Sequence, residues 1–198
     1  MKTETGQVIY HQDISQELED VFESKLVGRN LAEAEQQLLD RHGVRLMNTS
    51  GVADDVIHKE ISGLMNMAEH NQTIGGTLTK NCEVVNYRPH KMIGDTANME
   101  WVVETNSISV YPGAIGGDAP ASWVHELGHS AHDAWLDTKQ LFDNFDKGIR
   151  ASSYGHTNAF EDFAETFVAR VDGRWSGIAE AAPDKVRIVD EAIRRGLG

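Results

Sequence analysis

Residues 125–129 read His-Glu-Leu-Gly-His, and this stretch carries the clearest structural and chemical signal in the chain. Two histidines four residues apart lie on one face of a helix, so His125 and His129 can both reach one Zn²⁺ ion through their imidazole nitrogens. Glu126 is one residue further round the helix, where its carboxylate can take a proton from a zinc-bound water. The motif therefore predicts a helix that supplies two ligands and a general base to a zinc site.

A catalytic zinc ion needs a third protein ligand, and the sequence offers several patterns for it. The metzincin extension of the motif would place glycine at position 132 and histidine at position 135, but the chain has His132 and Trp135 there. His156 is a possible donor, yet it lies in a predicted turn with no fixed partner. The better candidate is Glu161, which lies on a helix predicted over residues 159–171.

Glu161 and Glu165 are four residues apart and share one face of that predicted helix. A carboxylate pair one turn apart suits a metal ligand plus an acceptor that orients a ligand imidazole. The alternative is structural, because Asn158 and Glu161 have the spacing of a capping box, in which the glutamate would bond the start of the helix. Beside an intact His-Glu-x-x-His motif, we expect the metal role for Glu161.

The second motif makes a family resemblance specific. Residues 153–165 read SYGHTNAFEDFAE, which matches the pattern Ser-Tyr-Gly-x-Thr-Asn-x-x-Glu-x-Phe-Ala-Glu. Together with the first motif, it resembles the catalytic domain of the anthrax toxin lethal factor family, which includes secreted endopeptidases that cut between prolines. The resemblance covers residues 123–170 and implies a gluzincin, in which two histidines and one glutamate bind a single zinc ion per chain.

The resemblance also implies a role for each of six side chains. These are zinc ligation by His125, His129 and Glu161, general-base chemistry by Glu126, donation of a phenol to the developing oxyanion by Tyr154, and orientation of a ligand histidine by Glu165. One departure concerns His132, because relatives tend to carry an acidic residue at that position. We expect His132 to lie on the surface, and an additional metal or substrate contact is the alternative.

These features predict a zinc-dependent endopeptidase that hydrolyses peptide bonds. A second hypothesis is an intracellular regulatory zinc peptidase that cleaves a repressor-type protein, because such sequences also join HELGH to an alanine-rich helix that carries the glutamate. A third hypothesis is a non-catalytic peptide-binding module that retains the fold. The complete Tyr-Gly-x-Thr-Asn block favours the first hypothesis over the second, and the intact His-Glu-x-x-His argues against the third.

The substrate is expected to bind as an added strand. In zincins generally, the substrate lies along an edge strand beside the active-site helix. Residues 107–111 are predicted to form a strand just upstream of the motif helix. We therefore expect the substrate edge strand to comprise Ser107, Ile108, Ser109 and Val110.

The hydrophobic pattern predicts an α+β fold in one zincin-like metallopeptidase domain that spans all 198 residues. Residues 1–75 are expected to be mainly helical, and the Gly-Gly pair at 75–76 is expected to mark a break that ends this helical part. A small mixed or antiparallel sheet follows within residues 81–111, with a hairpin that turns at 105–106. Residues 118–198 are expected to contain the active-site helix, the zinc site and further helices. The strands are predicted at 44–47, 82–87, 100–104 and 107–111.

Composition limits the partners. The chain has 18 Lys and Arg against 31 Asp and Glu, and its formal net charge of -13 disfavours binding to nucleic acid or anionic lipid. Cys82 is the single cysteine, so no internal disulfide and no cysteine-based zinc knuckle can form. We expect a peptide or protein substrate.

The sequence predicts neither a membrane span nor a secretory signal. No window approaches the ~18 consecutive apolar residues of a membrane span, and the polar N-terminus lacks the apolar core of a secretory signal. The sequence favours a cytoplasmic protein, or one that is exported or delivered by a route not encoded in this chain. It is equally compatible with a part of a larger toxin or phage protein.

Overall fold

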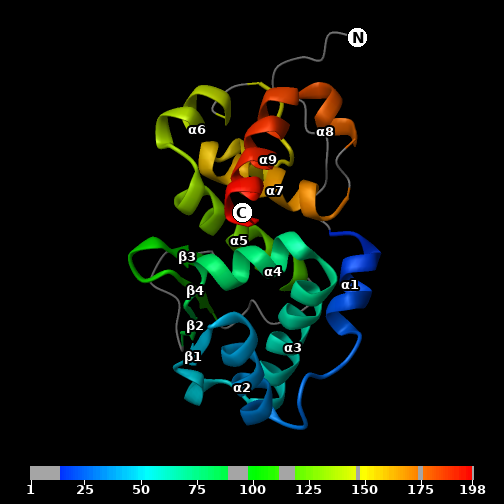
Figure 1. Cartoon of the computed structure of the whole chain (residues 1–198), viewed down its shortest axis with the longest axis vertical. Coiled ribbons are helices and arrows are strands. Elements are labelled where there is room, and N and C mark those ends of the chain that lie inside the picture. The colour runs from blue at the N-terminus through cyan, green and yellow to red at the C-terminus, as the bar shows by residue number, and fades with distance from the viewer. Residues whose placement is uncertain (1–13, 89–97, 112–118, 146–147, 174–175, 198) are drawn as a thin grey trace.

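Helix α5 (Ala119–Trp135) carries the His-Glu-x-x-His motif and lies at the centre of the fold (Figure 1). Trp123, Leu127 and Ala131 recur every four residues along it and are fully buried, so one stripe of the helix belongs to the hydrophobic core. The computed structural model describes residues 14–88, 98–111, 119–145, 148–173 and 176–197.

The protein has an α+β fold with a small mixed sheet, as the sequence predicts. Its strands are β1 (Arg45–Met47), β2 (Val84–Tyr87), β3 (Met99–Val102) and β4 (Ser107–Val110), in the spatial order β1-β2-β4-β3. The strands β1, β2 and β4 are parallel, whereas β3 is antiparallel to β4. The predicted hairpin is confirmed.

The expectation that residues 107–110 form the edge strand is wrong. β4 lies between β2 and β3, and all four of its residues, Ser107, Ile108, Ser109 and Val110, are buried. The hairpin turns through the 3-10 helix η2 (Val103–Thr105) and Asn106, which has a positive φ of 46°. This turn places β3 at the edge of the sheet. β4, the strand that directly precedes α5 in the sequence, therefore lies inside the sheet beside β3.

The N-terminal half of the chain supplies four helices. They are α1 (Gln16–Glu23), α2 (Leu31–His42), α3 (Asp54–His70) and α4 (Gln72–Asn81), with a 3-10 helix η1 (Thr49–Gly51) between β1 and α3. Helix α2 packs against β1, and α1, α2 and α4 all pack against α3. Side chains begin the first two, because Ser15 accepts a hydrogen bond from the Leu18 amide and Asn30 accepts one from the Glu33 amide.

The predicted break at Gly75-Gly76 is wrong, because both glycines lie inside helix α4. A Cβ at Gly75 would lie 2.4 Å from the Ala68 carbonyl oxygen, and one at Gly76 would lie 2.2 Å from Leu197 Cδ2. The glycines therefore serve close packing of α4 rather than a turn. The strand predicted from Cys82 begins two residues later, at Val84, because Cys82 still caps α4.

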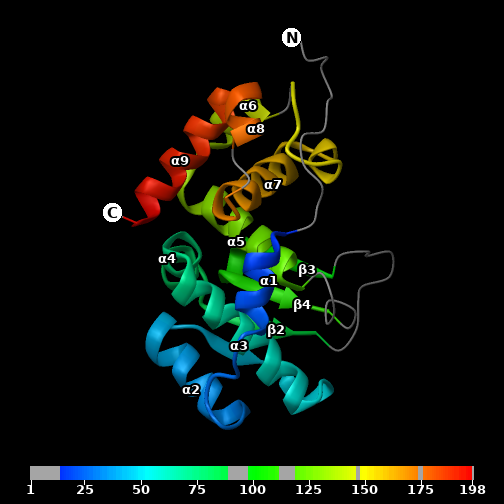
Figure 2. The same ribbon diagram turned by 90° about the vertical axis from the view of Figure 1, so that its right-hand side faces the viewer.

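The C-terminal part consists of helices on the other side of α5. They are α6 (Thr138–Phe145), α7 (Ala159–Val171), α8 (Ser176–Ala181) and α9 (Pro183–Leu197), with a 3-10 helix η3 (Tyr154–His156) before α7. Figures 1 and 2 both show α5 between this group and the lower group formed by the sheet and α1–α4. Among the described residues, no helix combines the length and apolar character that a membrane span requires.

Helices α5 and α7 make the contact that positions the site. They approach closely at Gly128, where a Cβ would lie 3.0 Å from Ala164 Cα and 3.2 Å from Phe167 Cβ. A larger side chain there would push the two helices apart. The close approach lets His125 and His129, on either side of Gly128 in the sequence, meet side chains of α7.

Candidate metal centre

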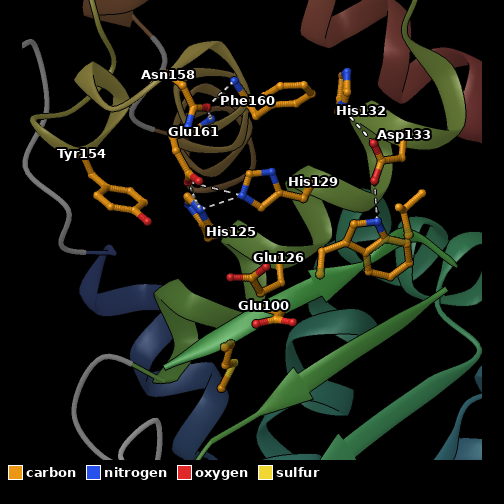
Figure 3. A pocket seen from close by; sticks show the side chains of 13 residues that line it. Glu100, His125, Glu126, His129, His132, Asp133, Tyr154, Asn158, Phe160 and Glu161 are labelled. Atoms are coloured by element: carbon orange, nitrogen blue, oxygen red, sulfur yellow. Dashed lines mark hydrogen bonds and ion pairs between the residues drawn. The ribbon is translucent and has the colours of Figure 1, made fainter. Parts of the chain in front are cut away.

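Two imidazoles from α5 and one carboxylate from α7 converge at the contact between these helices (Figure 3). His125 Nε2 lies 2.9 Å from Glu161 Oε2, and His129 Nε2 lies 3.4 Å from the same oxygen. The two Nε2 atoms are 3.1 Å apart. Within the described ranges, no other three His, Cys, Asp or Glu side chains bring their ligand atoms this close together.

The donor set fits a divalent zinc ion. Two Nε2 lone pairs that face each other at 3.1 Å repel unless a proton or a cation lies between them. Ligands about 2.0–2.1 Å from a tetrahedral zinc ion stand ~3.3 Å from one another. The observed separations of 2.9, 3.1 and 3.4 Å are close to that spacing. The site therefore presents two imidazole nitrogens and one carboxylate oxygen at spacings that could hold a divalent metal ion.

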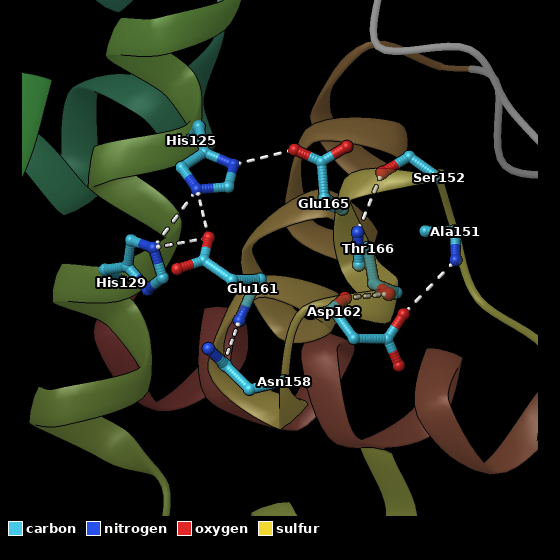
Figure 4. Close-up of polar contacts among 10 residues, drawn as sticks. His125, His129, Ala151, Ser152, Asn158, Glu161, Asp162, Glu165 and Thr166 are labelled. Carbon is cyan, nitrogen blue, oxygen red and sulfur yellow. Dashed lines mark hydrogen bonds and ion pairs between the residues drawn. The ribbon is translucent and has the colours of Figure 1, made fainter. Parts of the chain in front are cut away.

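Local sequence explains why Glu161 faces the imidazoles. Asn158 caps α7, because its side-chain oxygen accepts hydrogen bonds from the amides of Phe160 at 2.9 Å and Glu161 at 3.0 Å. The cap leaves the carboxylate of Glu161 directed at His125 and His129 (Figure 4). Asn158 thus forms the N-cap half of the predicted capping box, whereas the Glu161 side chain lies against the imidazoles.

Glu165 contacts the other nitrogen of the same imidazole. Its Oε1 lies 2.7 Å from His125 Nδ1, one helical turn beyond Glu161 (Figure 4). When His125 is neutral, the Nδ1–H donates to this carboxylate, and the Nε2 lone pair then faces Glu161 and His129. Glu165 thus selects the tautomer that a metal at this site requires.

Charge on the triad is set by these contacts. Burial alone lowers the pKa of His125, but its hydrogen bonds with Glu161 and Glu165 outweigh that effect and raise the pKa to about 10. Burial alone raises the pKa of Glu161, but its hydrogen bonds with the two imidazoles lower the pKa to about 2. Without an ion, therefore, His125 is protonated and Glu161 is ionised at neutral pH.

Glu126 lies beside the triad and not in it. Its side chain is nearly buried, with 6% exposed, and it lies between the imidazoles and the strand that carries Glu100 (Figure 3). Burial raises the pKa of Glu126, while the neighbouring imidazoles and a hydrogen bond from the backbone of Trp101 oppose that rise. A carboxylate of raised pKa at this place is suited to accepting and returning a proton.

Tyr154 lies to the left of His125 in Figure 3, whereas Glu126 lies below the two imidazoles. Its side chain is 43% exposed, and its ring centroid is 5.6 Å from that of His125. The preceding loop is anchored on Asp162, which is fully buried and accepts hydrogen bonds from the Ala151 amide at 3.2 Å and from Arg150 at 3.0 Å. Lys185 Nζ also donates to Asp162.

A pocket of about 410 Å³ opens onto these residues. Its lining comes from β3 and the start of η2, from the second half of α5, and from η3 and the start of α7. Acidic and aromatic side chains dominate its lining, and no Lys or Arg of the described residues is among them. The sequence indicated no role at the site for six of the lining residues, which are Met99, Glu100, Trp101, Val103, Asp133 and Phe160.

The expected surface position of His132 is wrong, because only 3% of this residue is exposed. Its ring packs edge-on against Phe160 and Phe163 of α7, with centroids 5.0 and 5.7 Å away. Its Nδ1 lies 3.0 Å from Asp133 Oδ1. The His132 ring is enclosed by side chains of α7, a long-range contact that the local sequence does not reveal, and His132 is not part of the candidate metal triad.

Comparison with known proteins adds no identity. No family model matches the chain, and no curated protein is significantly similar to it.

Removing Glu161 should weaken zinc binding far more than removing Glu165. Glu161→Ala deletes one of three ligands, whereas Glu165→Ala deletes only the group that orients His125, a loss that typically costs about 10–100-fold in metal affinity. Titration against a chelating dye measures both, with Glu180→Ala, at an exposed position of α8, as the control. Equal and negligible effects of the two substitutions would contradict the assignment.

Zinc binding at neutral pH should release about one proton. A ligand nitrogen must be unprotonated, so the ion has to displace the proton held on His125, whereas Glu161, with a pKa of about 2, is already ionised. Apparent affinity should rise about tenfold per pH unit below the pKa of His125. Calorimetry in two buffers of different ionisation enthalpy counts the protons, and a count of zero would show that the charge state is misassigned.

Proposed function

We propose that this protein is a zinc-dependent endopeptidase of the lethal factor type, with a zincin-like fold and a gluzincin metal site. The observation that carries the proposal is the convergence of His125 and His129 with the Glu161 carboxylate from a separate helix. Glu126 and Tyr154 both lie beside this triad, at different sides of it (Figure 3). Five side chains with these chemical types fit the hydrolysis of an amide bond.

The ion would be held by His125, His129 and Glu161. When bound, zinc would act as a Lewis acid that polarises the scissile carbonyl and lowers the pKa of water. Glu126 would take the proton of the attacking water and return it to the leaving amine, which its raised pKa favours. Burial keeps bulk water from competing for this carboxylate.

Tyr154 would stabilise the oxyanion. Its partial exposure and its place beside His125 leave the phenol at the rim of the pocket, where it can donate to a carbonyl oxygen of a bound peptide. Its role is therefore expected in the transition state, not in metal binding.

The substrate would be a peptide in extended conformation. β3 is the edge strand that borders the pocket, so it takes the substrate-binding role first assigned to β4. Main-chain pairing on β3 gives affinity with little sequence preference, and the pocket walls give selectivity. The acidic lining favours neutral or basic side chains over acidic ones.

Substitution of the general base tests the proposal. Glu126→Gln should retain zinc and lose nearly all cleavage of a peptide library, because the amide cannot accept the proton. Glu104→Gln, an exposed carboxylate on η2, is the control for the change of charge. A Glu126→Gln protein that cuts as fast as the wild type would overturn the catalytic proposal, and a zinc-loaded wild type that binds peptides without cutting them would favour a binding module.

Tyr154→Phe separates catalysis from metal binding. The variant should keep stoichiometric zinc and an unchanged peptide KM, while kcat falls about 10²–10³-fold, the usual cost of losing one oxyanion donor. Steady-state kinetics and metal analysis on the same preparation provide the measurement. Loss of zinc from this variant would show that the phenol has a different role.

A further inference from the structure

Asp133 lies at the end of the pocket furthest from Tyr154, and neither metal binding nor proton transfer uses it (Figure 3). It follows Glu126 by seven residues on α5, which is two helical turns or about 10 Å. Residues at this spacing lie on nearly the same face of a helix. Glu126 and Asp133 therefore face β3 together.

Both carboxylates contact the same residue of that strand. The indole Nε1–H of Trp101 donates a hydrogen bond of 2.6 Å to Asp133 Oδ2. The backbone of Trp101 also lies near the carboxylate of Glu126, where it lowers the pKa of that group. The indole of Trp101 thus ties the edge strand to α5 beside Glu126.

Asp133 is itself held in place. Its second oxygen, Oδ1, lies 3.0 Å from Nδ1 of His132, and the His132 ring is enclosed by Phe160 and Phe163. The carboxylate is thereby connected to α7, next to the metal ligand Glu161. A hydrogen bond to a carboxylate is stronger than one between neutral groups.

We propose that Asp133 is a positioning residue that acts through Trp101. By holding the indole, it keeps β3 aligned with α5, so that a peptide paired with β3 presents its scissile bond to Glu126. This inference rests on the proposed peptidase function. An offset of about 1 Å between a substrate and a catalytic group can cost on the order of 10²-fold in rate, which is why such a contact matters despite its partial exposure.

Kinetics of four variants test the role. Asp133→Ala removes the acceptor, Trp101→Phe removes the donor, the third variant combines both, and Asp133→Asn retains an acceptor oxygen. The two single deletions should each lower kcat roughly 10–100-fold with zinc content and Tm unchanged, and the double variant should be no slower than either. Asp133→Asn should remain within about threefold of the wild type.

Asp143→Ala is the matched control, because Asp143 is an exposed carboxylate that pairs with Lys139 on α6, away from the pocket. Asp133→Ala kinetics equal to those of this control would overturn the proposal. So would losses that add in the double variant, or a loss explained by lower Tm or lower zinc content. Failure of Asp133→Asn to restore turnover would also count against it.

Hydrogen exchange gives a readout that does not depend on turnover. Asp133→Ala and Trp101→Phe should speed exchange of the β3 amides, residues 99–102, whereas Asp133→Asn and Asp143→Ala should not. Unchanged exchange in Asp133→Ala would overturn the positioning role of Asp133 even if the enzyme is active. Faster exchange in Asp133→Ala and Trp101→Phe, together with a wild type that cuts no peptide, would support the contact between Asp133 and Trp101 as the group that holds β3 and would reject the proposed function.

Discussion

The close packing of α5 against α7 is the constraint on which the site depends. Gly128 leaves no room for a Cβ beside Ala164, so the two helices approach until imidazoles on one meet carboxylates on the other. The two imidazoles of the motif come from successive turns of α5, and Glu161 and Glu165 come from successive turns of α7. Helix geometry thus determines both the ligand triangle and the acceptor behind it.

The environment of this contact separates four carboxylates into different tasks. Glu161 has a lowered pKa because two imidazoles bond it, whereas Glu126 has a raised pKa because it is buried beside an edge strand. Glu165 orients an imidazole, and Asp162, which is fully buried, anchors the loop that precedes Tyr154. Neighbouring positions on α7 therefore face the imidazoles of α5 on one side of the helix and the scaffold on the other.

The parts of the site that follow local spacing could be predicted from sequence. His125 and His129, and Glu161 and Glu165, need only a regular helix to share a face, and the structure brings the two pairs together. The α+β class and the hairpin followed from hydrophobic patterns. Strand order, the burial of His132 and the helical packing of Gly75 and Gly76 depend on contacts between segments distant in sequence, and these predictions failed. Trp101 and Asp133 carried no motif, so only their meeting in space indicates a role.

A diffraction experiment on crystals of the zinc-loaded protein, with data collected on both sides of the zinc absorption edge, would locate the ion. We expect a single anomalous peak about 2.0–2.2 Å from His125 Nε2, His129 Nε2 and one oxygen of Glu161, with a fourth position open to the pocket. A peak elsewhere in the molecule, or one at which a different side chain replaces Glu161, would contradict it.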